Sequence, residues 1–430
     1  MRFMLDLRLL RENPDLVRKN IERRQDPDKV RLLDKVIEYD KVWRGLTTKL
    51  NGLRREKNRV SNSVSMLLRE GKEASQQMAE GEGIQKTIEE VGSERSDYEK
   101  LVRNGLMLLP NLLHDSVPFG KDDSQNVEFK RWGKPPDFEF EPKGHLELVV
   151  DLGLVDVERA AKVSGAGFMY LKGELVLLDL AIMRFAVDFL AKKGFGLVEP
   201  PFMIKRKAYE GVTALEDFEN VLYKVDGEDL YLIATSEHPM AAMFTDEVLD
   251  KKDLPVKFVG VSACFRKEVG THGKYTKGLF RMHHFNKVEQ FVFSLPEDSW
   301  QFHEELQRNS EELYQALGLH YRVVNVCTGD IGVLAAKKYD TEVWMADGTF
   351  REIGSNSNCT DYQARRLNIR YREKEGQAPK GFVHTLNNTA LATSRTMIAI
   401  LEQYQLRDGS VEVPRVLIPY MNGLERMMGK

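Results

Sequence analysis

The sequence has little cysteine and no long apolar run. Three cysteines occur among 430 residues, Cys264, Cys327 and Cys359, and no two of them form a CxxC pair. This usage argues against a disulfide framework and against a structural zinc cluster, and it fits a reducing compartment such as the cytoplasm. No apolar segment approaches the roughly 20 residues of a membrane-spanning helix. Charges interrupt the apolar N-terminus, so neither a membrane span nor a signal peptide is expected.

The common nucleotide-binding fingerprints are missing as well. No glycine-lysine-serine/threonine motif of a P-loop is present, and Gly194-Phe-Gly196 lacks the third glycine of a dinucleotide fingerprint. Any nucleotide must therefore be held by other groups, such as arginines on a sheet. The net charge of −3 argues against indiscriminate nucleic-acid binding by the whole surface, but it leaves room for a local basic element.

Proline is absent between Pro27 and Pro110, which leaves room for long helices. From Leu32 the apolar residues recur in steps of four and three, the heptad pattern of a coiled-coil seam. The pattern predicts a helix over residues 28–69, about 60 Å long at roughly 1.5 Å per residue. The seam positions, of which only Lys57 is charged, are Leu32, Val36, Tyr39, Trp43, Leu46, Leu50, Leu53, Lys57, Val60, Val64 and Leu67.

The heptad pattern stops at Gly71 and resumes in a new register. The polar stretch between the two runs contains Gly81 and Gly83, so we expect a glycine-bearing turn and an antiparallel helical hairpin over about residues 28–104. A homodimeric coiled coil is the alternative for any heptad run, and the break with its shift of register favours the hairpin. The second run comprises Ile84, Ile88, Val91, Arg95, Tyr98 and Val102.

Charge is unevenly divided between the two predicted helices. Residues 41–72 are rich in lysine and arginine, whereas the returning helix is acidic. A basic stripe that includes Arg54, Arg55 and Arg59 can follow a phosphate backbone; the alternative is a solvated helix face balanced by its acidic partner. No aromatic residue lies between Trp43 and Tyr98, so we expect contacts with backbone and shape rather than with bases.

A change of composition after the hairpin indicates a domain boundary. Residues 121–142 are predicted to be a loop-rich linker, because Trp132-Gly-Lys-Pro-Pro-Asp interrupts both helical and strand periodicity. The linker separates an N-terminal domain, residues 1–120, from a second domain, residues 143–430. In the second domain, residues 173–193 have a broad apolar helical face, and a short strand at Leu197 follows.

The most informative stretch of the second domain lies between Val256 and Phe293. An apolar strand is followed by a glycine-rich segment, 270–278, and by a second, alternating strand, which predicts an antiparallel hairpin. We expect Arg266 and Glu268 to share a face of the first strand. On the second strand, the residues with the parity of one face are Arg281, His283, Phe285 and Glu289. Arginines, an aromatic ring and carboxylates suit phosphates, a base and an amine; the alternative is a surface hairpin with a solvated charged face.

At these residues the chain resembles motif 2 of the class II aminoacyl-tRNA synthetases. The longer match, FR-x-E followed by G-L-x-R-x-H-x-F-x-K-V-E, is similar to the seryl-tRNA synthetases in particular. The helix, strand and prolines at 173–201 resemble motif 1, which forms the dimer interface in that family. Thr235-Ser-Glu237 resembles the Thr-x-Glu element that binds serine, although Ser/Thr-x-Glu before a helix is usually a capping motif.

Two later segments resemble the same family. Glu352 and Ser355 are hard oxygen donors of the kind that Mg²⁺ takes, with a turn capping a helix as the alternative. Many members have two serines after Glu-Ile; here Gly354 stands in place of the first, so only Ser355 is carried over. Arg395, near the start of a helix that follows small residues, resembles motif 3, although the glycines of many members are absent; a buried helix with one paired arginine is the alternative.

The resemblance implies an α+β fold: a catalytic domain with an antiparallel sheet flanked by helices, and an N-terminal coiled-coil arm. It implies serine activation by ATP and transfer to tRNA(Ser), in a cytoplasmic homodimer that needs Mg²⁺ but no zinc; tRNA(Sec) as a further substrate is left open. Arg54, Arg55 and Arg59 would contact tRNA. Arg266 and Arg395 would be catalytic, and Glu352 and Ser355 would bind Mg²⁺.

The remaining roles implied by the resemblance concern the two small substrates. The expected ATP-binding residues are Arg266, Lys267, Glu268, Arg281, Met282, Phe285, Glu352, Ile353, Gly354, Ser355 and Arg395. The expected serine-binding residues are Thr235, Ser236, Glu237, Arg266, Glu289, Asn387 and Thr389. Three alternatives remain: a synthetase-derived binding protein without activation, a coiled-coil adaptor, and a zinc-dependent seryl form, which the scattered cysteines disfavour.

Overall fold

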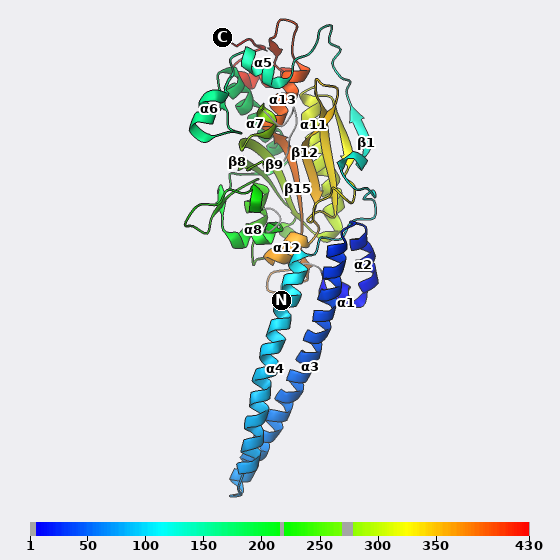
Figure 1. Cartoon of the computed structure of the whole chain (residues 1–430), viewed down its shortest axis with the longest axis vertical. Coiled ribbons are helices and arrows are strands. Elements are labelled where there is room, and N and C mark those ends of the chain that lie inside the picture. The colour runs from blue at the N-terminus through cyan, green and yellow to red at the C-terminus, as the bar shows by residue number, and fades with distance from the viewer. Residues whose placement is uncertain (1–5, 216–218, 269–277, 430) are drawn as a thin grey trace. The chain divides into compact units, whose positions relative to one another are not determined.

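The structure, a computed structural model, describes residues 6–215, 219–268 and 278–429 (Figure 1). The chain divides into two compact units, Met1–Pro110 and Asn111–Lys430. The backbone N–H of Asn111 donates to the carbonyl of Val333 at 2.8 Å, so the second unit includes the segment that follows the arm. None of the helices in these ranges combines the length and the apolar character that crossing a bilayer requires.

The first unit consists of two short helices and two long ones. Asp26 accepts hydrogen bonds from the backbone N–H groups of Asp28 and Lys29, and Pro27 occupies the first helical position, so the first long helix begins where a cap and a proline both favour it. The long helices pack side by side as an antiparallel pair (Figure 1). The four helices are α1 Leu7–Glu12, α2 Pro14–Glu22, α3 Pro27–Arg69 and α4 Ser75–Leu108.

The predicted heptad seam is confirmed in α3, where every predicted position is buried or partly buried. The one charged seam residue, Lys57, donates to the side chain of Gln85 on α4 at 2.5 Å, so the polar position is satisfied across the pair. The predicted turn is wrong in its extent. Gly71 lies in the turn with φ +68°, but Gly81 and Gly83 are helical, and α4 begins at Ser75.

The second unit is built on an eight-stranded sheet in the order β1-β10-β11-β12-β15-β9-β8-β4. Figure 1 labels β1, β12, β15, β9 and β8 among these strands. All neighbouring pairs in this sheet are antiparallel except β4 and β8. The strands of this sheet are β1 Val127–Trp132, β4 Gly196–Val198, β8 Val256–Phe265, β9 His284–Ser294, β10 Tyr321–Asn325, β11 Lys337–Trp344, β12 Phe350–Asn358 and β15 His384–Ala392.

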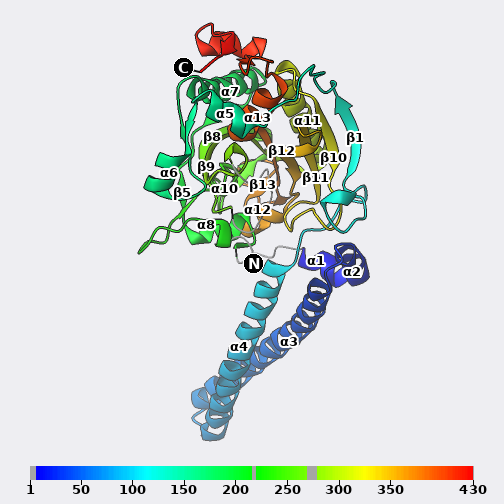
Figure 2. The ribbon, with the colours of Figure 1, turned by 45° about the horizontal axis from the view of Figure 1, so that its top comes forward.

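Helices and short strand pairs surround this sheet. In both views of the second unit, α5 and α13 lie toward one end, and α8 and α12 toward the other (Figure 2). The helices are α5 His145–Asp151, α6 Val157–Ser164, α7 Glu174–Lys192, α8 Arg206–Val212, α10 Glu237–Ala242, α11 Ser299–Ala316, α12 Tyr362–Leu367 and α13 Thr393–Gln403. The smaller strands are β2 Val155–Asp156, β3 Tyr170–Leu171, β5 Met203–Ile204, β6 Tyr231–Leu232, β7 Val248–Asp250, β13 Arg370–Arg372, β14 Gly381–Phe382, β16 Val411–Glu412 and β17 Arg426–Met427.

Alternation along β9 divides the core between the two faces of the sheet. Val288 and Val292 pack into a core shared with α7, α11 and α13. Phe291 and Phe293, on the other face, pack into a second core with α8, α10 and α12, and each buried ring stabilises the fold by roughly 2 kcal/mol. Glu289 has the parity of the two phenylalanines, so it emerges on the face that carries the second core.

Several predicted elements are confirmed and two local predictions are wrong. The helix predicted over 173–193 is α7, and the predicted strand from Val256 ends at Phe265 as expected. The stretch 126–142 is not wholly loop, because β1 pairs with β10 at the edge of the sheet. Arg266 and Glu268 lie just beyond the end of β8 rather than on it. The glycine-rich loop predicted over 270–278 falls, except for Gly278, outside the described residues.

Candidate functional site

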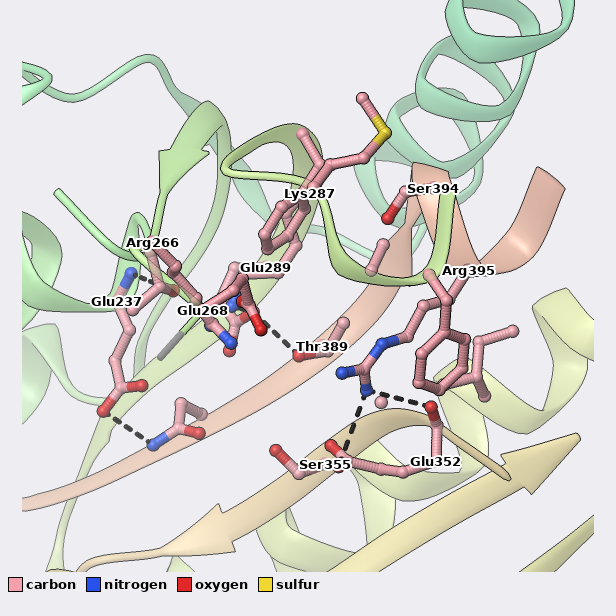
Figure 3. A pocket seen from close by; sticks show the side chains of 18 residues that line it. Glu237, Arg266, Glu268, Lys287, Glu289, Glu352, Ser355, Thr389, Ser394 and Arg395 are labelled. Atoms are coloured by element: carbon pink, nitrogen blue, oxygen red, sulfur yellow. Dashed lines mark hydrogen bonds and ion pairs between the residues drawn. The ribbon is translucent and has the colours of Figure 1, made fainter. Parts of the chain in front are cut away.

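A pocket lies where β9, β12 and β15 pass the start of α13 and the start of α10 (Figure 3). Its lining brings together side chains that are far apart in the sequence. Figure 3 shows Glu237 at one end, Arg395 and Glu352 at the other, and Glu289 with Thr389 between them. The predicted site residues in its lining are Thr235, Glu237, Arg266, Glu268, Met282, Phe285, Glu289, Glu352, Ile353, Gly354, Ser355, Asn387, Thr389 and Arg395.

Three predicted residues lie outside this lining. Ser236 is completely buried beside the pocket. The ammonium of Lys267 lies 5.6 Å from the ring centre of Tyr223. Arg281 ends a short 3₁₀ helix, Gly278–Arg281, instead of lying on the strand, and its guanidinium is 3.5 Å from a carboxylate oxygen of Glu268. The expectation that Arg281 and His283 lie on the second strand is therefore wrong, because β9 begins only at His284.

Four lining residues were not predicted: Phe280, Lys287, Ala392 and Ser394. Lys287 could have been predicted as a pocket residue. It has the same strand parity as Phe285 and Glu289, and it belongs to the Lys-Val-Glu run that ends the motif 2 match. Ala392 and Ser394 flank the point where β15 passes into α13, and no residue-type signal distinguishes them. Phe280 lies in the 3₁₀ helix, which the sequence pattern did not indicate.

Amide side chains hold the carboxylate at the Glu237 end of the pocket. Asn387 on β15 and Gln363 on α12 each donate from a side-chain nitrogen to Oε1 of Glu237 at 3.1 Å. Burial, and next the charge of Glu289, raise the pKa of Glu237 to about 7. The backbone N–H of Glu237 donates to the hydroxyl of Thr235 at 3.2 Å, whereas Ser236, the capping residue of α10, makes no side-chain capping hydrogen bond.

A buried ion pair occupies the middle of the pocket. The ammonium of Lys287 is 2.6 Å from Oε2 of Glu289, and both side chains are nearly inaccessible. The hydroxyl of Thr389 donates to the same oxygen at 3.2 Å. Strand register explains this arrangement, because Thr389 on β15 is the direct partner of Glu289 on β9. Lys287 supplies the counter-charge that a buried carboxylate requires, and removing one partner of such a pair costs about 3–5 kcal/mol.

The arginine that follows β8 is fixed by its surroundings. Nε of Arg266 donates to the carbonyl of Ala234 at 3.2 Å, and its guanidinium carbon lies 5.4 Å from the ring centre of Phe285. The guanidinium therefore stacks near an aromatic ring at the pocket wall, where a flat base can also stack. Glu268 lies two residues further along in the left-handed region, with φ +45°.

A second arginine and a carboxylate form the far end of the pocket. Arg395 donates from one guanidinium nitrogen to the carbonyl of Glu352 at 2.9 Å, and that nitrogen is 3.5 Å from Oε2 of Glu352. The Glu352 side chain keeps 44% of its surface accessible. Enclosure in the pocket raises the pKa of Glu352, but the charges of Arg395, Lys338 and Arg266 outweigh that effect, and the pKa lies below its usual value.

Steric crowding explains why position 354 is a glycine in this chain. A Cβ added to Gly354 would lie 3.1 Å from the carbonyl of Thr389 and 3.2 Å from the hydroxyl of Tyr314. A serine at this position would therefore need its neighbours to shift. Ser355, the next residue, lines the pocket together with Glu352, so two hard oxygen donors meet there. Among the described residues, no group of three or more His, Cys, Asp and Glu side chains is arranged to hold a metal ion by itself.

The basic residues predicted on the arm are exposed in the first unit. Arg54 and Arg55 are exposed, and the Arg59 side chain keeps 77% of its surface accessible with Glu56 3.7 Å away. An exposed pair of this kind is worth little in stability, so these guanidinium groups remain available for a partner. No residue of the first unit belongs to the lining of the pocket described above.

Comparisons with known proteins converge on one family. The tRNA synthetase class II core domain (G, H, P, S and T) matches residues 221–404, and the seryl-tRNA synthetase N-terminal domain matches residues 4–113. A "Serine--tRNA ligase" of Methanocella arvoryzae is 54% identical over 423 residues, which cover 98% of this chain and 100% of that protein.

Two solved structures are similar over the whole length. A crystal structure of seryl-tRNA synthetase from Pyrococcus horikoshii complexed with ATP superposes with a TM-score of 0.96 and 48% identity, covering 99% of this chain and 100% of that one. A cytoplasmic serine-tRNA ligase from Naegleria fowleri in complex with AMP has a TM-score of 0.91 and 36% identity, with 100% of both chains covered.

Proposed function

The chain belongs to the seryl-tRNA synthetase family of class II, and on that premise we propose which of its residues perform each step of the reaction. The reaction is the ATP-dependent ligation of serine to tRNA. The serine carboxylate attacks the α-phosphorus of ATP and expels pyrophosphate. The terminal adenosine of tRNA(Ser) then attacks the seryl-adenylate and releases AMP. Whether tRNA(Sec) is also charged is left to a charging assay.

The observation that carries the assignment is the division of one pocket into two ends. Glu237 and Glu289 form an acidic end suited to an ammonium group and a hydroxyl, with Thr235, Asn387 and Thr389 beside them. Arg266, which Figure 3 shows beside Glu237, and Arg395 at the far end supply two cationic groups suited to phosphates. A substrate that carries an amine, a hydroxyl and a carboxylate would therefore be held with its carboxylate facing the nucleotide.

The nucleotide roles follow from the wall between the two ends. Phe285 would stack on adenine, with Glu268 near the exocyclic amine, and Arg266 would fork onto the α-phosphate. Arg395 would hold the outer phosphates. Arg281 pairs with Glu268 and stands outside the lining, so its proposed phosphate contact requires it to exchange that partner. Met282, Ile353 and Gly354 would shape the wall around the nucleotide. Lys267 would contribute through its backbone.

Little covalent chemistry falls to the protein in this proposal. Positioning converts a bimolecular attack into an effectively unimolecular one, and the arginines stabilise charge that develops on the phosphoryl oxygens. The pocket needs no histidine as a general base, because the attacking carboxylate is already ionised. His283 contacts Tyr223 and Phe168 outside the pocket and would support the hairpin of β8 and β9.

A homodimer is supported by apolar side chains exposed near motif 1. Val176 and Leu180 on α7 are 37% and 53% exposed, and Leu197 on β4 is 55% exposed. Val176 and Leu180 are four residues apart and share one face of α7, and motif 1 is the expected dimer element. A cytoplasmic location is supported by the three cysteines, which are free and buried.

Serine-dependent exchange of pyrophosphate into ATP tests the activation step, and we predict strong discrimination in it. Alanine is expected to be activated about 10⁴-fold or more slowly than serine, because a site that pairs a substrate hydroxyl leaves its own buried groups unpaired when that hydroxyl is missing. Threonine differs by one methyl group and is expected to be the commoner error, with discrimination of only about 10- to 200-fold. Comparable exchange rates for alanine and serine would contradict the proposed pocket.

The proposed metal is Mg²⁺, held by Glu352 and Ser355 together with phosphate oxygens. When bound, the ion would neutralise charge on the nucleotide. Ser355→Ala is expected to raise the Mg²⁺ concentration for half-maximal exchange by about tenfold or more. Ser357, on the same strand but outside the pocket lining, provides the control variant Ser357→Ala. Elemental analysis should find no stoichiometric zinc in the purified protein; zinc that is lost together with activity would overturn the proposal.

A further inference from the structure

A glutamine behind the pocket donates a hydrogen bond to one of the pocket carboxylates. Gln363 is the second residue of α12 and is completely buried, and it does not line the pocket. Its side-chain nitrogen donates to Oε1 of Glu237 at 3.1 Å and to the carbonyl of Val212 at 3.1 Å. Its side-chain oxygen accepts from the hydroxyl of Thr385 at 2.7 Å. Both N–H groups and the oxygen of this amide therefore each have a partner, and the three partners belong to different elements.

The orientation of this amide follows from its partners. A backbone carbonyl can only accept a hydrogen bond, so the group that faces Val212 must be the NH₂ of Gln363. The second hydrogen of that NH₂ points to Glu237, and the oxygen is left to the Thr385 hydroxyl. Flipping the amide would place an oxygen against both the carbonyl and the carboxylate. Gln363 is thus locked as a donor to Glu237.

The donors that surround Glu237 are directed to one of its two carboxylate oxygens. Gln363 and Asn387 both donate to Oε1 of Glu237. Two hydrogen bonds to one oxygen fix the rotation of the carboxylate and leave Oε2 for a ligand. We propose, on the basis of the function assigned above, that Gln363 is a positioning residue which fixes the Glu237 carboxylate for the ammonium group of serine.

The same hydrogen bond favours the ionised state of Glu237. Burial and Glu289 raise the pKa of Glu237 to about 7, whereas Lys287, Gln363 and Arg266 oppose that rise. The other titratable group that faces this carboxylate is the thiol of Cys359, at the end of β12, which is 3.9 Å from the amide nitrogen of Asn387. Losing the donor from Gln363 would move the pKa of Glu237 further above 7.

The ionisation of Glu237 sets the direction of the pH effect. Serine binding needs ionised Glu237, which is present above its pKa and lost as the pH falls through it. A variant without the Gln363 donor therefore has less ionised Glu237 at pH 7, and it regains the ionised form as the pH rises. Deprotonation of the serine amine at high pH affects wild type and variant alike, so the ratio of their KM values isolates the effect of Glu237.

The test uses Gln363→Met, which keeps the side-chain length and removes the donor. In serine-dependent exchange at pH 7 we expect the serine KM to rise about 10- to 100-fold, the loss typical of a hydrogen bond to a charged group. The ATP KM should stay within about twofold of wild type. The ratio of variant to wild-type serine KM should fall as the pH is raised from 7 to 9.

The control is Gln307→Met. Gln307 is a buried glutamine on α11 that donates to the hydroxyl of Thr341 and does not line the pocket. The Gln307→Met variant should leave the KM values for serine and for ATP unchanged. If Gln363→Met does not fold, Gln363→Leu takes its place, since leucine also lacks a donor and should raise the serine KM with the same pH dependence. An unchanged serine KM, or equal rises for serine and ATP, would overturn the proposal. Failure of wild type to show exchange would instead refute the assigned function.

Discussion

Arg266→Ala is expected to lower serine-dependent pyrophosphate exchange by at least about 10²- to 10³-fold while the protein stays folded. Arg266 is the arginine proposed to fork onto the phosphate that is attacked, and it is held in place by the carbonyl of Ala234 and by the ring of Phe285. A preorganised donor at developing charge contributes on this scale, because it acts in a site that water has left. Exchange kinetics and a thermal melt of the same preparation measure the two effects.

A lysine substitution and a neighbouring arginine sharpen this experiment. Arg266→Lys keeps the charge but loses the planar fork, so it should recover only a small part of the rate. Arg351 is next to Glu352 in the sequence, lies outside the pocket lining and pairs with Asp347 at 2.6 Å. Arg351→Ala should exchange pyrophosphate at nearly the wild-type rate. If Arg266→Ala retains wild-type exchange, the phosphate assignment is wrong.

The arm was predictable in detail because its pattern is local. A helix buries its apolar face through steps of three and four, and the seam from Leu32 to Leu67 follows those steps without a slip. The turn was less predictable, since Gly81 and Gly83 are tolerated inside α4. A Cβ added to Gly81 would lie 3.7 Å from a methyl group of Val60, which is ordinary contact, and Gly83 has open space around it. The glycine-rich composition suggested that Gly81 and Gly83 lie in a turn, but their surroundings also allow them in a helix.

The pocket residues that belong to recognisable motifs could be predicted from the sequence. The contacts that depend on how distant strands pair could not. Glu289 and Thr389 meet because β9 and β15 are paired at those positions, and the sequence alone contains no such register. Strand alternation suggested that Arg281 lies on β9. The backbone instead forms a 3₁₀ helix up to Arg281, and the ladder between β8 and β9 ends at Phe265 and His284. Gln363 carries no local signal at all, because its role depends on three partners distant in the sequence.

The largest effect on the second half of the reaction is expected from the arm. The triple substitution of Arg54, Arg55 and Arg59 by alanine should weaken tRNA(Ser) binding by about tenfold or more at low salt. It should also make the plot of log binding constant against log salt concentration less steep by about two to three. The reason is that each phosphate contact releases about one counterion on binding, and three contacts are lost. Exchange without tRNA should be unchanged, because the pocket lining contains no residue of the first unit.

Controls for the arm can be taken from its own returning helix. Lys100 and Arg103 are exposed cations on α4, outside the predicted basic stripe, and their double substitution by alanine should change tRNA binding and its salt slope much less. The resemblance implies a dimer in which an arm reaches tRNA docked on the other subunit, and the proposed homodimer can be tested for this. Mixed dimers should therefore charge tRNA when the arm variant and Arg266→Ala lie on different subunits, because the intact arm of one subunit then serves the intact site of the other. When both changes lie on one subunit, no intact arm faces an intact site and charging should be lost. Activity should differ between the two arrangements of the damage. If the triple variant charges tRNA(Ser) at the wild-type rate with an unchanged salt slope, the basic stripe is a solvated helix face, and the arm has a structural or adaptor role.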